Sequence, residues 1–155
     1  MRTDMSHYFR SAVLAAGALI WSIGVTLVAQ APGTPGTPGT TKTTKDGIYT
    51  AEQSTRGEAV YKGKCSSCHG DDLTGGGFAP ALAGDAFFEQ WSEKKLSELS
   101  SEIKDSMPAD KPGSLTPDET ADVLAYVLKS NGLPAGAAPL SNDAAALAQV
   151  AIAKP

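Results

Sequence analysis

Two cysteines and a histidine stand close together near the middle of the chain. Cys65 and Cys68 are separated by two serines, and His69 follows directly. The sequence contains no other cysteine, and its other histidine, His7, lies near the N-terminus. Two thiols and an imidazole at this spacing could contribute to a metal site, form a redox pair or a disulfide, or hold a prosthetic group covalently.

The spacing Cys-x-x-Cys-His favours covalent attachment, because it is the attachment sequence for c-type haem. Thiols three residues apart at a helix end lie near enough to bond both vinyl groups of one porphyrin. The next residue then sits under the iron and can bind it through an imidazole nitrogen. We therefore predict one haem c attached through Cys65 and Cys68, with His69 as an iron ligand.

The other uses of a Cys-x-x-Cys pair fit this sequence less well. A thioredoxin-like redox pair needs a βαβ setting, and no stretch of this chain alternates like a strand. A structural zinc site needs four ligands, and the chain beyond its N-terminal segment offers only Cys65, Cys68 and His69. A simple disulfide fits an oxidising compartment but leaves the histidine unexplained.

Met107 is the predicted second iron ligand. The other methionines are Met1 and Met5, so Met107 is the one that remains if the N-terminal segment is removed. An isolated methionine is generally more often a core filler. This one stands in a loop immediately before Pro108, between a helix end and a Pro-Gly stretch, which favours ligation. Methionine and histidine together raise the potential of a haem iron.

Residues 1–31 are predicted to be an export signal. Arg2 and Arg10 precede an apolar stretch over 12–29, and Ala29-Gln30-Ala31 fits a signal peptidase site. The alternative is an uncleaved membrane anchor, because the stretch is near the lower length limit for crossing a bilayer. Both interpretations place the remainder in the periplasm or another extracytoplasmic compartment, and the anchor would tether it to the membrane.

The remainder of the chain divides into a linker, a domain and a tail. Residues 32–46 are rich in proline, glycine and threonine. With almost no apolar side chains they cannot repay the entropy of ordering, so we predict a flexible linker. Residues 47–132 hold the helical patterns. Residues 133–155 form a tail whose segment 143–153 could be one more helix packed on the domain, or a disordered end.

The domain is predicted to be all-α, with four or five short helices around one covalently bound haem. Thr50 and Gln53 form a capping box that begins a helix over about 51–64. Asp85 can cap a short helix that runs as far as Trp91.

Two further helices follow from periodicity and capping signals. Leu96 begins an apolar face that repeats at helical spacing, and this helix must end near Met107, because a residue before proline disfavours the helical conformation. The last helix begins with Thr116 as its N-cap, Pro117 in the first position and Glu119 completing the capping box, and it ends at Gly132.

Net charge excludes one class of partner. The formal net charge is -4, whereas binding to nucleic acid requires a basic face. The sequence therefore predicts no nucleic-acid partner.

The attachment motif and the loops around it resemble class I cytochromes c, over about 47–132. Residues 65–69 match the attachment motif of that family, and Met107-Pro108 matches its axial Met-Pro pair. Pro80 matches the proline whose carbonyl accepts a hydrogen bond from the ligating histidine in the family. This resemblance implies a cytochrome c fold and assigns Pro80, with His69 and Met107, to the haem site.

Two packing motifs extend the resemblance. Gly57 and Tyr61 match the Gly-x-x-x-aromatic pair of the family's first helix, and residues 124–127 resemble the last helix that crosses it. The stretch from Tyr49 to Gly136 is most similar to monohaem cytochrome c domains that accompany periplasmic quinoprotein alcohol dehydrogenases.

The resemblance implies an electron carrier of the respiratory chain rather than an enzyme. An iron bound by histidine and methionine has no open position for a substrate. Expected partners are redox proteins: a dehydrogenase or quinol-oxidising donor, and an oxidase or another cytochrome as acceptor. A cytochrome subunit of a quinoprotein dehydrogenase complex is the alternative. A ligand-binding haem sensor or peroxidase would need the Met107 bond to be absent.

Overall fold

The computed structural model describes residues 42–155, and the predicted export signal lies outside the described residues. In this part of the chain the all-α prediction is confirmed. Four helices of seven or more residues form the body: α1 (Ala51–Lys64), α3 (Asp85–Trp91), α4 (Leu96–Ser106) and α5 (Pro117–Ser130). The remaining elements are short: α2 (Ser66–His69), α6 (Ala144–Leu147), a 3-10 turn η1 (Thr44–Asp46), and strands β1 (Lys42–Thr43) and β2 (Val150–Ala151).

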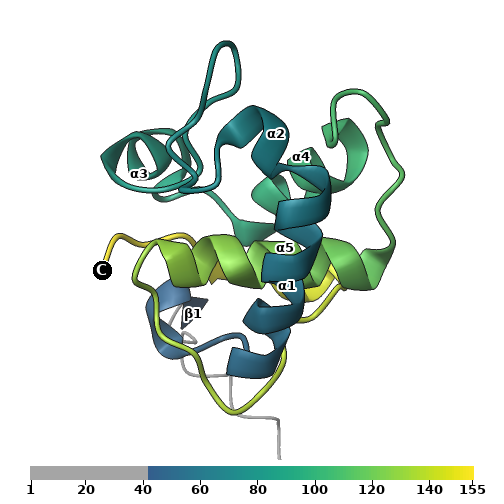
Figure 1. The fold of residues 1–155 in the computed structure, drawn as a ribbon. Helices are drawn as coiled ribbons and strands as arrows, with labels where there is room; N and C mark the ends of the chain where they lie inside the picture. Colours follow the sequence, from purple (N-terminus) through teal and green to yellow (C-terminus); the bar gives the residue numbers. More distant parts are fainter. Residues whose placement is uncertain (1–41) are drawn as a thin grey trace, which may run out of the picture. The chain divides into compact units, whose positions relative to one another are not determined.

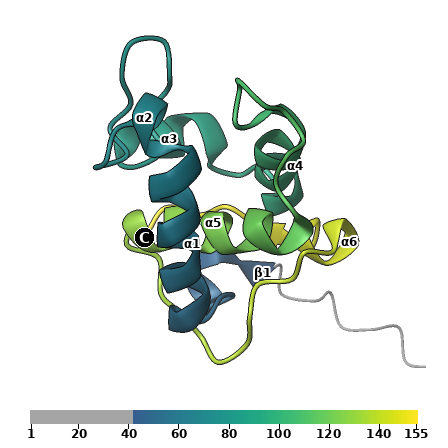
Figure 2. The same cartoon turned by 45° about the vertical axis from the view of Figure 1, so that its right-hand side comes forward.

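Helices α1 and α5 cross in direct contact, as Figures 1 and 2 show. Gly57 makes the crossing possible, because a Cβ atom built there would lie 1.8 Å from the carbonyl oxygen of Asp122. One turn along α1, the Tyr61 ring packs on Tyr126 of α5 with 5.3 Å between the ring centroids. The glycine and aromatic pair of the first helix therefore does what the sequence motif predicts.

Helix α5 begins at Pro117 with the predicted capping box. The Glu119 amide donates to the Thr116 hydroxyl over 3.2 Å, and the Thr116 amide donates to the Glu119 carboxylate over 3.0 Å. Both bonds satisfy amides that an unfinished helix end would leave without partners. Most of α5 beyond this cap is buried, so it is the central element of the fold.

Two capping predictions need correction. Thr50 does cap α1, but the Gln53 side chain does not return to the cap, because it bonds both the amide and the carbonyl of Leu140 at 2.7 and 3.1 Å. Asp85 is the first residue of α3 rather than its cap, which is Gly84. The Asp85 carboxylate instead accepts a bond from Lys154 at 2.7 Å. In both cases a partner distant in sequence replaces the local one.

The two ends of the described chain pair with each other. Strand β1 runs parallel to β2, and the Thr44 side chain is fully buried, with its hydroxyl bonded to the backbone of Ala153. Residues 42–46 therefore belong to the packed domain and not to a flexible spacer, because their bonding partners come from the C-terminal end.

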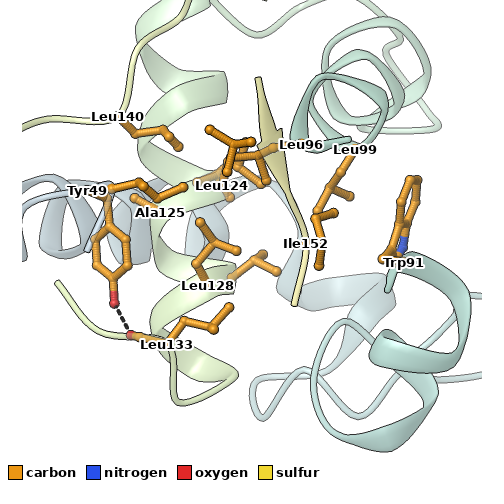
Figure 3. Close-up of a cluster of buried hydrophobic side chains, with 14 of the residues drawn as sticks. Tyr49, Trp91, Leu96, Leu99, Leu124, Ala125, Leu128, Leu133, Leu140 and Ile152 are labelled. Carbon is orange, nitrogen blue, oxygen red and sulfur yellow. Dashed lines mark hydrogen bonds between the residues drawn. The ribbon is translucent and has the colours of Figure 1, made fainter. Parts of the chain in front are cut away.

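The tail packs on the domain but is not a helix over 143–153. Only α6 is helical there, and the chain then extends as β2. The Ile152 amide and carbonyl bond to the backbone of Lys94 and Glu93, both at 2.9 Å, and these bonds require an extended backbone. Figure 3 shows the Ile152 side chain among buried residues of three helices, including Trp91 and Leu99.

Both ribbon views place α2, α3 and α4 on one side of α5, with β1 and the connection after α5 on the other. Helix α2, which ends at His69, lies on the first side. No helix within residues 42–155 is long and apolar enough to cross a membrane.

Candidate haem site

The cysteine motif lies at the junction of α1 and α2. Cys65 ends α1, with its amide bonded to the Tyr61 carbonyl at 2.8 Å, and its own carbonyl accepts the amide of His69 at 3.0 Å. The helical turn therefore runs directly from the first cysteine to the histidine. Cys65 is partly buried and Cys68 is exposed, and the two are not joined in a disulfide.

The environment of Cys65 distinguishes a thioredoxin-like redox pair from a haem-attachment pair. Burial raises the pKa of the Cys65 thiol to about 11, because a low-dielectric surrounding disfavours the charged thiolate. Redox-active Cys-x-x-Cys pairs have the opposite property, a lowered thiol pKa that supplies the reactive thiolate. Cys65 is therefore poorly suited to a thioredoxin-like role.

His69 is buried and held in one orientation. Its Nδ1 atom lies 2.8 Å from the carbonyl oxygen of Pro80. Because a carbonyl only accepts, Nδ1 carries the proton in this bond, and Nε2 then keeps its lone pair for a metal. The structure thus brings together two residues that the sequence assigned to the site, in the relation that the resemblance implies.

The loop from Gly70 to Gly84 carries Pro80 back to the histidine. The Gly75 amide donates to the His69 carbonyl at 2.9 Å, and the Leu82 amide donates to the Leu73 carbonyl at 2.8 Å. Gly75 has a positive φ of 83°, and a Cβ there would lie 2.7 Å from the Ala79 carbonyl oxygen. The loop therefore closes tightly on itself, and only glycine fits at this point.

Two side chains that the sequence did not assign to the site support this loop from the helices. The Tyr61 hydroxyl donates to the Gly70 carbonyl at 2.5 Å. The Asn131 amide, at the end of α5, bonds to the backbone of Leu82 and Gly84 at 2.9 and 3.0 Å. In sequence Asn131 precedes Gly132 and suggests only a helix end, so no local signal indicates its contact with a loop far along the chain.

Met107 occupies the C-cap of α4 and is partly exposed. Its amide donates to the Ile103 carbonyl at 3.2 Å, which completes the last turn of the helix. The structure bonds His69 to Pro80 but records no bond between Met107 and either of them. Helices α2 and α4 lie on the same side of α5 in both views, so the two predicted ligands share a side of the molecule.

The residues present fit a covalently bound haem. Two free thiols stand one helical turn apart, and the neighbouring imidazole has its Nδ1 engaged and its Nε2 available. Haem also needs an apolar wall, and the buried core is bordered by half-buried side chains that could supply one. These are Val60, Cys65, Leu82, Ala83, Ile103 and Tyr126.

Residues 52–127 match the family described as cytochrome c oxidase, cbb3-type, subunit III, which is a c-type cytochrome family. This region of the chain is therefore a c-type cytochrome domain, and haem c bound covalently is the cofactor that follows. The predicted recognition of a class I c-type cytochrome is confirmed. The narrower resemblance to partners of quinoprotein alcohol dehydrogenases stays a prediction.

Two known proteins are similar to the chain. Thiosulfate dehydrogenase of Stutzerimonas stutzeri (strain A1501) is 35% identical over 78 residues, which cover 46% of this chain and 25% of that protein. The sulfane dehydrogenase SoxCD of Paracoccus pantotrophus aligns with a TM-score of 0.45 and 24% identity, over 73% of this chain and 61% of that chain. The chain thus spans about a quarter of the length of the curated relative.

Proposed function

We propose that this chain is a monohaem electron carrier whose iron is held by His69 and Met107. The observation that carries the proposal is the 2.8 Å bond between His69 Nδ1 and the Pro80 carbonyl, which leaves Nε2 free to bind iron. When bound, haem c supplies an iron that accepts one electron and releases one electron. The protein supplies covalent attachment, ligation and a partly apolar surrounding.

Each residue of the site has a distinct part in this proposal. Cys65 and Cys68 hold the group through thioether bonds, so it cannot diffuse away outside the cytoplasm. His69 would bind the iron through Nε2, while Pro80 keeps its ring oriented. Met107 would supply a thioether ligand, which would favour the reduced state and leave no open position for a substrate. One electron enters from a donor protein and leaves to an acceptor protein.

Phe78 supports brief docking near the site. Among the described residues it is the only large apolar side chain that is fully exposed, and it lies two residues from Pro80. The loop that carries Phe78, between α2 and α3, projects from the body in both ribbon views. An exposed aromatic two residues from Pro80 offers a small apolar contact, as transient redox encounters use.

A cytochrome subunit of a dehydrogenase complex is the second candidate. The similarity to a thiosulfate dehydrogenase favours it, because a dehydrogenase then provides the electrons at a fixed interface. An oxidase or another cytochrome would accept them. Co-purification of a tagged chain with a dehydrogenase subunit in its native host would support this candidate, and recovery of the chain alone would favour the freely diffusing carrier.

We further propose an extracytoplasmic location, in the periplasm or another compartment outside the cytoplasm. The apolar stretch over 12–29 and the Ala29-Gln30-Ala31 site support export. The intact mass of the haem-containing protein distinguishes a cleaved export signal from an uncleaved membrane anchor. A mature chain that starts at Pro32 would indicate cleavage, and a full-length chain in the membrane fraction would indicate an anchor.

The substitution Met107→Ala tests the ligand set. The protein is expressed with haem-attachment machinery, and visible spectra are recorded in both oxidation states. We expect the parent to show the weak red band of ferric iron bound by a thioether sulfur, and Met107→Ala to lose it. The control is Ser101→Ala on the same helix α4, which removes only an exposed side-chain hydroxyl.

Two results would contradict the proposal. If Met107→Ala keeps the red band, another sulfur binds the iron. If the parent lacks the band and readily binds carbon monoxide or cyanide, the iron has an open position, and the sensor or peroxidase alternative replaces the carrier.

A further inference from the structure

Both polar atoms of the Asn131 side-chain amide form hydrogen bonds at one buried position, where the end of α5 meets the loop after Pro80. Its Nδ2 donates to the carbonyl of Val127 at 2.8 Å and to that of Leu82 at 2.9 Å, and its Oδ1 accepts the Gly84 amide at 3.0 Å. The residue is only 8% exposed. One bond is local to α5, and the other two reach a loop that is remote in sequence.

Those two bonds hold the segment that follows Pro80. The Leu82 peptide is fixed on both sides, because its carbonyl accepts from Asn131 while its amide donates to Leu73 at 2.8 Å. Only Ala81 separates Leu82 from Pro80, and the proline ring restricts the backbone further. Asn131 therefore holds the backbone two residues beyond the Pro80 carbonyl.

The Pro80 carbonyl is the atom that orients His69, at 2.8 Å from Nδ1. A hydrogen bond from the outer nitrogen of a ligating histidine to a carbonyl fixes the ring and raises the basicity of the ligand. We propose that Asn131 is a positioning residue for the axial histidine: through Leu82 and Gly84 it fixes the Pro80 carbonyl, and so tunes electron donation from His69 to the iron. This inference rests on the proposed function for ligation by His69.

A purely structural role for Asn131 makes a different prediction. As a C-cap of α5 it would affect stability alone, through the bond to Val127. The positioning role requires that loss of the loop bonds also changes the iron. A weaker Pro80 bond makes His69 a poorer electron donor, which destabilises the ferric state, so the reduction potential rises.

The test compares haem-containing variants of the full chain. Asn131→Leu removes all three bonds with little change in size. Asn131→Ser removes the loop bonds, because serine is too short to reach them, while its hydroxyl can still bond the carbonyl of Val127, four residues earlier. The control is Asn142→Ala, whose amide bonds only the exposed Asp118 at 2.8 Å. Midpoint potential, thermal midpoint and the proton NMR shifts of the haem methyl groups are measured for each.

We expect Asn131→Ser and Asn131→Leu to raise the midpoint potential and to displace the haem methyl shifts, which report the orientation of the histidine ring, whereas Asn142→Ala matches the parent in both. If Asn131→Ser lowers the thermal midpoint but leaves potential and methyl shifts at the control values, Asn131 only stabilises the fold, and the inference is wrong. If Asn131→Leu does not incorporate haem, the comparison of Asn131→Ser with the control still tests the inference.

Failure of the proposed function would give a different result from failure of the positioning role. A parent protein without a low-spin, histidine-bound spectrum would overturn ligation by His69 and the inference with it. A parent with a low-spin spectrum whose potential is insensitive to Asn131→Ser would overturn only the positioning role. Loss of the Met107 assignment would leave the inference intact, because Asn131 acts on the opposite ligand.

Discussion

Two regions that meet at Tyr61 are held together by different forces. The helix crossing, where α1 meets α5 at Gly57, depends on volume, because backbone touches backbone and no side chain intervenes. The attachment loop, residues 70–84, depends on hydrogen bonds, because few of its side chains are buried and its position comes from bonds to His69, Asn131 and Tyr61. An added atom should therefore destabilise the helix crossing, and the loss of a hydrogen-bond donor should destabilise the loop.

The largest effect is expected from one added methyl group at the crossing. In Gly57→Ala the new Cβ would lie 1.8 Å from the Asp122 carbonyl oxygen, so the helices must separate. We expect a loss of about 3 kcal/mol in the free energy of unfolding, which is the upper range for overpacking. Urea unfolding of the haem-containing protein measures the change.

Gly63→Ala is the matched control on the same helix. Nothing lies within 4 Å of its Cβ position, so the substitution should stabilise α1 by about 0.5 kcal/mol through helix propensity. Equal effects of the two substitutions would show that backbone contact does not control the crossing.

A smaller effect is expected from removal of one donor to the attachment loop. Tyr61→Phe keeps the ring on Tyr126 but deletes the bond to the Gly70 carbonyl. We expect a loss of about 1 kcal/mol in the free energy of unfolding at neutral pH. Tyr126→Phe is the control, because no hydrogen bond of the Tyr126 hydroxyl is found among residues 42–155.

The same substitution should change the response to alkaline pH. Burial raises the pKa of Tyr61 from 10.0 to about 12. The unfolded chain loses this proton first, so the stability contributed by Tyr61 is complete below pH 10 and declines as the pH rises to about 12. Tyr61→Phe should lack this component of alkaline destabilisation, and an unchanged pH profile would argue against a buried, hydrogen-bonded hydroxyl.

The smallest effect is expected at the surface, where Lys64 at the end of α1 bonds Glu119 near the start of α5. Bonds from Lys64 and from the Thr116 amide hold the pKa of Glu119 below its ordinary value of 4.5. Because the folded-state pKa is lowered, the stabilisation is present above pH 4.5 and is lost as the pH falls through the folded value. Glu119→Gln should therefore flatten the acid limb of stability against pH, because it lowers stability slightly at pH 7 and leaves stability at low pH nearly unchanged. An acid limb as steep as that of the parent would show that Glu119 is not a source of it.

Short-range signals were sufficient for several parts of this molecule. Thr116, Pro117 and Glu119 lie within four residues and define the start of α5 by local bonds alone. The Cys65–His69 motif likewise specifies its chemistry within one helical turn, and the family match over 52–127 confirms the class. Local geometry of this kind depends on neighbours in sequence, so it is visible before the chain is folded.

Long-range partners explain where sequence-based prediction was wrong. Gln53 was assigned to a local cap but bonds Leu140, and residues 42–46 were assigned to a linker but pair with the C-terminal end, where Thr44 is buried. The segment 143–153 was predicted to be either one more helix or a disordered end, yet Ile152 bonds Glu93 and Lys94 as extended chain. Each of these residues has an adequate local alternative, and only its partner in space selects between them.

The sequence alone determined the haem-attachment chemistry, the helical class and the glycine that permits the crossing, because each follows from residue type and close spacing. Tertiary structure decided that the two chain ends pair, and that Asn131 and Tyr61 support the loop that carries Pro80. The physical reason is that a hydrogen bond between remote residues leaves no periodic trace in the sequence. It exists only after the hydrophobic core has brought α1, α5 and the loop together.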